Sequence, residues 1–196
     1  MSKKIGLFFG SFDPIHNGHI QIVKSLHFSS FDQIWFVVTP ESPFKKGQVI
    51  ASFYDRLEMV KLSIGNHKKF IASDLECQLP PPYYTANTLA FLQEKYSYYS
   101  FEIIMGSDNY ASLINGDWYK SDYILNHFQI VVFPRDQKII KPHISLTVLE
   151  SDVIPTSSTS IRLSLSSSSN QIKQLSLHPL VKEYIKRKKI YSSENQ

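Results

Sequence analysis

The stretch that decides the fold is FFGSFDPIHNGH, residues 8–19. It continues an apolar run, residues 4–9, which ends at Gly10 and has the pattern of a buried strand. Asp13-Pro14 then makes a turn, and apolar residues at helical spacing follow over about 18–28. The stretch therefore predicts a buried strand, a glycine turn and a helix in immediate succession.

The same alternation of strand and helix patterns continues along the chain. Buried strands are predicted at 33–40, 70–76, 101–106, 128–135 and 144–150, and helices at 53–64, from an N-cap at Thr85, from 155 and over 178–191. Alternating strands and helices are typical of a Rossmann-like α/β fold, a doubly wound parallel sheet with helices on both faces. We expect a single domain, residues 1–196, whose C-terminal helical segment, about 157–190, packs on the sheet.

Composition narrows the class of protein. With 196 residues the chain can bury a full core, and it has neither a signal-peptide pattern nor an apolar run long enough to span a membrane. Cys77 is the only cysteine, which excludes an intrachain disulfide and fits a cytoplasmic protein. The net charge of +4 suits an anionic substrate but does not indicate nucleic acid. The basic run at 186–189 is typical of a solvated helix end.

Three polar segments follow predicted strands, at residues 10–19, 39–46 and 106–109. In an open parallel sheet, ligands bind beyond the carboxyl ends of the strands. Gly10 lets the backbone approach a phosphate, and a helix beginning near Asn17 presents free N–H groups to it. His16 and His19 add donors that can become cationic. The segment predicts a phosphate site, although an ordinary turn with solvated histidines would also fit.

The HxGH pattern after FDP resembles the signature of the nucleotidyltransferase superfamily, which class I aminoacyl-tRNA synthetases share. The resemblance implies that a substrate phosphate attacks the α-phosphorus of ATP, that pyrophosphate leaves, and that His16 and His19 stabilise the transition state. TSSTSIR, residues 156–162, resembles the superfamily's SSTxIR motif. A serine-rich helix start with free N–H groups, hydroxyls and Arg162 one turn further on suits the β- and γ-phosphates of ATP, although a capping sequence with a surface arginine would also fit. Mg²⁺ is implied as a chelate carried in with ATP, without a protein ligand.

Longer segments are similar to the nicotinate-nucleotide adenylyltransferase family. These are TPESPFKKGQVIASFYDRLEMVKLSI (39–64), YYTANTL (83–89), IIMGSDNYASLINGDWYK (103–120) and LVKEYIKRKKIY (180–191). The similarity runs from about residue 4 to 191 and implies that ATP and nicotinate mononucleotide are converted to deamido-NAD and pyrophosphate, in NAD biosynthesis. The chain departs from the family pattern at Phe9, where a glycine is usual, and at Asn87, where an aspartate is usual.

The resemblance also carries roles to single positions. It implies catalytic roles for His16, His19, Lys45 and Arg162. It implies ATP binding by Gly10, Ser11, Phe12, Gly18, Gly106, Asp108, Ser157 and Ser158. It implies binding of the nicotinate nucleotide by Thr85, Asn87, Trp118 and Tyr119.

Other functions stay open at this point. The acceptor could be nicotinamide mononucleotide or phosphopantetheine, and a non-catalytic nucleotide sensor could keep the same fold. An enzyme is favoured by the presence together of His16, His19, Lys45, Asp108, Ser158 and Arg162, since binding alone would not need both imidazoles. An RNA-binding role is least favoured, because the sequence has no organised basic and aromatic motif. The sequence leaves open whether the chain forms a homo-oligomer.

Overall fold

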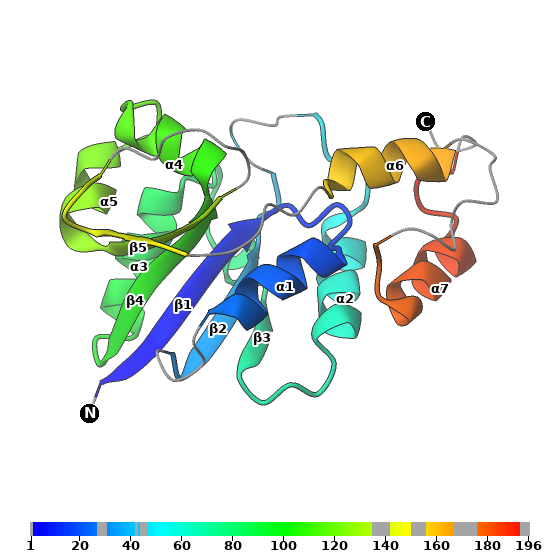
Figure 1. Ribbon diagram of the computed structural model, residues 1–196, viewed down its shortest axis with the longest axis horizontal. Coiled ribbons are helices and arrows are strands. Elements are labelled where there is room, and N and C mark those ends of the chain that lie inside the picture. The colour runs from blue at the N-terminus through cyan, green and yellow to red at the C-terminus, as the bar shows by residue number, and fades with distance from the viewer. Residues whose placement is uncertain are drawn as a thin grey trace.

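A six-stranded parallel sheet forms the centre of the protein (Figure 1). The computed structural model describes residues 2–26, 31–41, 43, 47–134, 142–149, 156–166 and 176–192. The strands are β1 (Lys3–Gly10), β2 (Gln33–Val38), β3 (Phe70–Ser73), β4 (Tyr99–Gly106), β5 (Gln129–Phe133) and β6 (Leu146–Val148), in the order β3-β2-β1-β4-β5-β6. The strand order reverses between β1 and β4, so that a crevice opens at their carboxyl ends. The predicted doubly wound α/β fold is confirmed.

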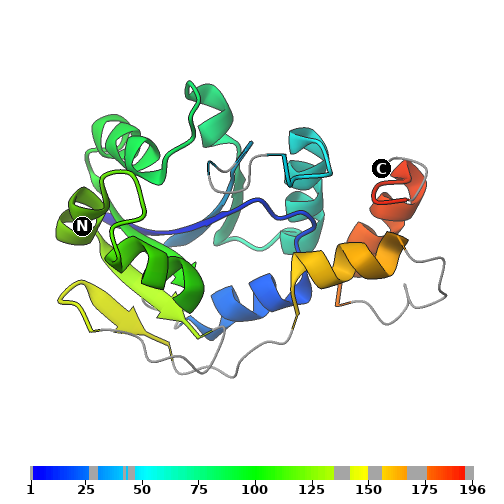
Figure 2. The same ribbon diagram turned by 90° about the horizontal axis from the view of Figure 1, so that it is seen from above.

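Helices cover both faces of this sheet. They are α1 (Asn17–Ser25), α2 (Phe53–Ile64), α3 (Thr85–Lys95), α4 (Ser107–Ile114), α5 (Ser121–His127), α6 (Ser158–Ser166) and α7 (Pro179–Lys188), with a 3-10 turn, η3 (Leu75–Gln78). Figure 2 shows α1 and α3 on opposite sides of β1. Two hydrophobic clusters follow from this, one containing residues of α1, α2 and α7 and the other residues of α3, α4 and α5.

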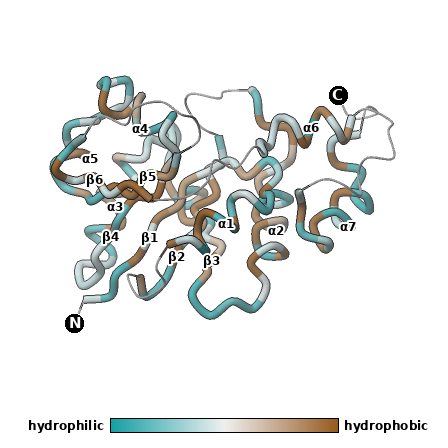
Figure 3. The backbone as a smooth tube through the Cα atoms, viewed as in Figure 1, coloured by the Kyte–Doolittle hydropathy of each residue, from teal (hydrophilic) through white to brown (hydrophobic). Residues whose placement is uncertain are grey.

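Alternation along β1 explains how the strand serves both clusters. Ile5 and Leu7 pack on the α3–α5 side, whereas Phe8 packs on the α1–α2 side, because successive side chains point to opposite faces. Central parallel strands are therefore apolar on both faces. In Figure 3 the strands contain brown, hydrophobic stretches, whereas the loop between α2 and β3 is teal and hydrophilic. None of the described helices is long and apolar enough to cross a membrane.

The C-terminal helices lie at the end of the molecule away from β5 and β6 (Figures 1 and 2). α7 contacts α2, and Val181, Tyr184 and Ile185 are buried, as the helical spacing predicted. Ile161 of α6 belongs to the same hydrophobic cluster. The segment thereby extends the α1–α2 layer.

Several boundaries differ from the sequence predictions. The strand predicted at 70–76 ends at Ser73, where the chain turns into η3. Thr85 is the first residue of α3 rather than its N-cap, which is Tyr84. The helix predicted to about residue 28 ends at Ser25, and residues 27–30 lie outside the described part. The short helices α4 and α5 were not predicted, because eight and seven residues give too few turns for a clear periodic pattern.

Candidate active site

The two histidines lie against one another at the start of α1. His16 is the N-cap and its backbone N–H donates to Nδ1 of His19 at 3.2 Å. The ring centroids are 3.7 Å apart, and the two residues are 3% and 7% exposed. Since Nδ1 of His19 accepts this hydrogen bond, a neutral ring carries its proton on Nε2. The site can therefore present a ring N–H to a ligand from a fixed, buried position.

Most residues predicted for catalysis and for ATP binding line one cavity of about 190 Å³, at the carboxyl ends of β1 and β4. Those it brings together are Gly10, Ser11, Phe12, His16, His19, Gly106, Ser157, Ser158 and Arg162. They come from the first strand, the first helix, the fourth strand and α6. Segments almost 150 residues apart in the sequence thus form a single wall, as expected for a site at the switch point.

A glycine at position 10 is required by the packing of Phe12, in addition to leaving the backbone open to a phosphate. A Cβ atom at this position would lie 2.9 Å from the Phe12 ring, closer than real contacts allow. Phe12 itself has a φ of +48°, a left-handed conformation that costs on the order of 1 kcal/mol for a residue with a side chain. Its ring packs edge-on to His19 at 5.2 Å. The turn therefore buries an aromatic ring beneath the histidines and leaves its backbone along the cavity.

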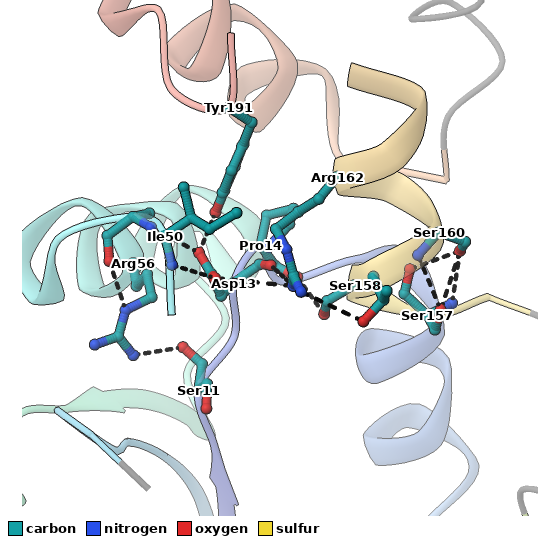
Figure 4. Close-up of polar contacts among 12 residues, drawn as sticks. Ser11, Asp13, Pro14, Ile50, Arg56, Ser157, Ser158, Ser160, Arg162 and Tyr191 are labelled. Atoms are coloured by element: carbon teal, nitrogen blue, oxygen red, sulfur yellow. Dashed lines mark hydrogen bonds and ion pairs between the residues drawn. The ribbon is translucent and has the colours of Figure 1, made fainter. Parts of the chain in front are cut away.

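The serine-rich start of α6 is fastened to the Asp13-Pro14 turn (Figure 4). The Ser158 hydroxyl donates to the carbonyl of Pro14 at 2.9 Å, and Nη1 of Arg162 donates to the carbonyl of Asp13 at 2.8 Å. The carboxylate of Asp13 lies 3.8 Å from the same guanidinium. These contacts hold the helix start that was predicted to bind phosphates beside the turn that leads to the two histidines.

Asp13 is the centre of a buried hydrogen-bond network that sequence reasoning missed. Its carboxylate accepts from the backbone N–H groups of Ile50 and Ala51 at 2.9 and 3.0 Å, and from the Tyr191 hydroxyl at 2.6 Å. Figure 4 shows Asp13 between these partners and Arg162. Burial, and next the charge of Asp13, raise the pKa of Tyr191, which therefore stays a donor. Tyr191 ties the C-terminal end of the described chain to the turn.

Arg56 of α2 joins the loops on the other side of the turn, and it is 1% exposed. Nη1 donates to the carbonyls of Ser11 and Thr39, both at 2.7 Å, Nη2 to Pro40 at 2.7 Å, and Nε to Ala51 at 3.1 Å. Burial lowers its pKa, opposed by the charge of Asp13. One signal could have found it: Arg56 stands four residues before Val60, on the helix face that carries the core residues.

A second cavity, of about 230 Å³, opens beside the first. Its wall includes the predicted Thr85, Trp118 and Tyr119, and the Tyr119 ring stacks on Tyr84 with centroids 4.6 Å apart. Thr39, Pro43, Tyr83 and Ser112 also line it, so the wall combines aromatic rings with small polar side chains. The two cavities share the residues Phe9, Gly10, Ser11 and Asn109. A ligand group in one cavity can therefore meet a group in the other at the carboxyl end of β1.

Three predicted residues line neither cavity, and a fourth lies outside the described residues. Gly18 is buried in the first turn of α1 and does not line either cavity. Asp108 and Asn87 are exposed and line neither cavity. Lys45 lies outside the described residues. Asn109, which sequence reasoning missed, lines both cavities from the residue after Asp108.

Glu76 is a carboxyl group buried close to the second cavity, with 1% of the residue exposed. Burial raises its pKa from 4.5 to about 7, against hydrogen bonds from Thr88 and Thr39 that lower it. A carboxyl group whose pKa is higher in the folded state stabilises the fold below pH 4.5, and that contribution is lost as the pH rises through 7.

We therefore expect the unfolding free energy of the wild type to fall by about 3 kcal/mol between pH 4.5 and 7.5, relative to Glu76→Gln. Urea denaturation at several pH values measures this difference, and the glutamine variant provides the control because it does not titrate. Parallel stability curves for the two proteins would mean that the carboxyl keeps an ordinary pKa.

The sheet order, the paired imidazoles and the serine-rich helix start at the switch point define an α/β nucleotidyltransferase. The model of the cytidylyltransferase-like family matches residues 7–164. The protein named "Probable nicotinate-nucleotide adenylyltransferase" of Cytophaga hutchinsonii is 38% identical, over 97% of this chain and 99% of its own length. The protein of the same name from Flavobacterium psychrophilum is 40% identical, over 96% and 98%. The chain belongs to the nicotinate-nucleotide adenylyltransferases of the cytidylyltransferase-like family.

Among solved structures, the chain is similar to the Plasmodium falciparum nicotinic acid mononucleotide adenylyltransferase complexed with NaAD. The TM-score is 0.78 at 22% identity, with 99% of this chain and 98% of the other covered. At this level of identity the likeness concerns the fold, which agrees from end to end.

Proposed function

We propose that the protein transfers the AMP group of ATP to the phosphate of nicotinate mononucleotide, giving deamido-NAD and pyrophosphate in NAD biosynthesis. The observation that carries this proposal is the meeting of two cavities at Gly10 and Ser11, one lined by His16, His19 and Arg162 and the other by several aromatic rings among polar side chains. A bisubstrate reaction between two nucleotides needs this arrangement. Similarity to probable nicotinate-nucleotide adenylyltransferases over nearly the full length supports it.

ATP occupies the first cavity in this proposal. The N–H groups at the start of α6, the exposed Ser157 hydroxyl and Arg162 receive the β- and γ-phosphates, while the Ser158 hydroxyl holds the Pro14 carbonyl and Ser158 contributes its backbone N–H. An oxygen of the acceptor phosphate forms a bond to the α-phosphorus, while the bond from that phosphorus to the bridging oxygen breaks and pyrophosphate leaves with the electron pair. His16 and His19 donate to the charge that develops on the phosphate oxygens. No covalent bond to the protein forms.

Nicotinate mononucleotide occupies the second cavity. The Trp118 and Tyr119 rings offer flat surfaces for the pyridine ring. The first turn of α3, beginning at Thr85, directs its N–H groups and positive dipole end to the nicotinate carboxylate. Ser11 and Asn109, at the junction of the cavities, lie where the two reacting phosphates would meet.

Magnesium enters this proposal with ATP, where it neutralises phosphate charge when bound. The described residues contain no group of three or more histidine, cysteine or acidic side chains arranged to hold a metal ion. The Asp13 carboxylate, which lines the first cavity, already accepts three hydrogen bonds from Ile50, Ala51 and Tyr191. The donor set thus fits an ion held mainly by phosphates and waters. Lys45 is proposed to reach the phosphates from its loop.

A pyrophosphate-release assay with ATP and three separate acceptors tests the function. Nicotinate mononucleotide should give the highest kcat/KM, ahead of nicotinamide mononucleotide and phosphopantetheine. A higher value with either of the other two would reassign the acceptor. ATP binding without turnover on any of the three would favour a nucleotide sensor.

A further inference from the structure

Two tyrosines of the C-terminal segment, residues 176–192, donate their hydroxyls to aspartates near the start of the chain. The Tyr184 hydroxyl donates to Asp55 of α2 at 2.8 Å, and the Tyr191 hydroxyl donates to Asp13 at 2.6 Å. Asp13 lines the first cavity, whereas Asp55 lines neither cavity. Tyr191 is therefore the tyrosine of this pair that contacts a residue of the proposed ATP site.

The donors around Asp13 occupy both oxygens of its carboxylate (Figure 4). Oδ1 accepts from the Ala51 N–H and the Tyr191 hydroxyl, and Oδ2 accepts from the Ile50 N–H. Nη1 of Arg162 lies 3.8 Å from Oδ2, beyond hydrogen-bond distance, and donates instead to the backbone carbonyl of Asp13 at 2.8 Å. The guanidinium is thus held beside the carboxylate without a hydrogen bond to it.

Arg162 has donors left for a ligand. It lines the first cavity, and its side chain is 18% exposed. Among the described residues, its hydrogen bonds go to the Asp13 carbonyl and, at 3.4 Å, to the Thr159 hydroxyl. A guanidinium carries five N–H groups, so others can bind a phosphate. The Asp13 carboxylate and the phosphates of ATP are therefore two anions that compete for one cation.

We propose that Tyr191 is a positioning residue for ATP, whose hydroxyl satisfies the Asp13 carboxylate and so keeps Arg162 available to the β- and γ-phosphates. This inference rests on the proposed place of ATP in the first cavity. Without the hydroxyl, the buried carboxylate loses one of its three donors, and the adjacent guanidinium can replace it. A shift of about 1 Å would bring Nη1 into a direct hydrogen bond with the carboxylate and turn the guanidinium away from the triphosphate.

Tyr191→Phe tests this role, because it removes the hydroxyl and keeps the buried ring. We expect the Kd for a non-hydrolysable ATP analogue to rise about fivefold, less than the full worth of a hydrogen bond to a charged group. The Kd for AMP, which lacks the β- and γ-phosphates, should change less than about twofold, because Arg162 does not serve its single phosphate. Equilibrium titration of the full chain gives both constants. A general loosening of the site would weaken both ligands alike.

Tyr184→Phe is the matched control. It removes the other tyrosine hydroxyl that this segment donates to an aspartate, and neither Tyr184 nor Asp55 lines a cavity. Both binding constants should therefore stay at their wild-type values. Sucrose in every titration favours the folded state, so that a less stable variant can still be measured.

A second comparison places Arg162 between the hydroxyl and the ligand. In an Arg162→Ala background the cation on which Tyr191 acts is gone, so Tyr191→Phe should change the Kd for the ATP analogue less than about twofold. A structural effect of the lost hydroxyl would persist in that background with its full size. The non-additivity of the two substitutions is therefore the signature of the proposed role.

The binding measurements and the turnover assay decide the inference and the proposed function separately. Equal affinity of the wild type and Tyr191→Phe for the analogue, or equal losses for the analogue and AMP, would overturn the inference and leave the proposed function intact. An undiminished effect in the Arg162→Ala background would overturn it as well. The expected loss for the analogue alone, without turnover on any acceptor, would support the inference and overturn the proposed function. A wild type that does not bind the analogue would overturn both.

Discussion

Replacing His19 with alanine should lower kcat for adenylyl transfer by about 10²- to 10³-fold, the usual cost of removing one donor to a developing oxyanion. The affinity for ATP should weaken less than about tenfold, because a donor directed to charge that grows in the transition state contributes little to the ground state. Single-turnover measurements give the chemical rate, and equilibrium titration with a non-hydrolysable ATP analogue gives the binding constant.

Two controls make this comparison specific. His19→Gln places an amide N–H near the position of Nε2 and should recover part of the lost rate. His67→Ala removes an exposed imidazole that stacks on Phe70 and lines neither cavity. This variant should leave kcat unchanged. Equal losses of rate and of ATP affinity in His19→Ala would contradict a transition-state role.

The sequence predicted the strands and the strand–turn–helix segment that leads to His16 and His19 because both depend on local patterns. Residues 8–19 contain the strand, the turn and the helix start within one short segment, and their geometry is set by neighbours in the chain. Apolar runs of five or six residues likewise identify the buried strands without knowledge of their partners. Because the strands are parallel, their carboxyl ends lie at one edge of the sheet, whereas these patterns do not give the order of the strands.

The network beneath the site could not be predicted in this way, because its bonds join distant segments. Asp13 and Tyr191 are 178 residues apart, and Arg56 bonds to backbone carbonyls, which every residue possesses and which carry no sequence signal. Asn109 was missed because the prediction was wrong by one residue at the start of α4. α4 begins at Ser107, directly after β4, and its helical turn directs Asn109 to the cavities, whereas Asp108 lines neither of them. A one-residue shift in a helix moves a side chain by about 100°.

Arg56 lines neither cavity, but it should matter for the site because its donors hold Ser11 and Thr39, which do. Replacing it with methionine keeps much of the buried volume but removes the donors to Ser11, Thr39, Pro40 and Ala51. Buried carbonyls without donors each cost about 1–3 kcal/mol, and part of this cost is relieved when water enters. We expect the unfolding free energy to fall by about 3–5 kcal/mol, measured by urea denaturation.

The KM values of the folded Arg56→Met variant distinguish a purely structural role of Arg56 from a role in positioning the cavity walls. Ser11 and Thr39 line the cavities, so Arg56→Met should also raise KM for both substrates when assayed well below its melting temperature. Arg56→Lys should be intermediate, because an ammonium group cannot reproduce the planar fork of donors. Arg187→Met, at an exposed arginine over the Tyr184 ring, should cost less than about 1 kcal/mol and leave KM unchanged. If Arg56→Met were as stable as Arg187→Met, the loops at the strand ends would have to be held by the Asp13 network alone.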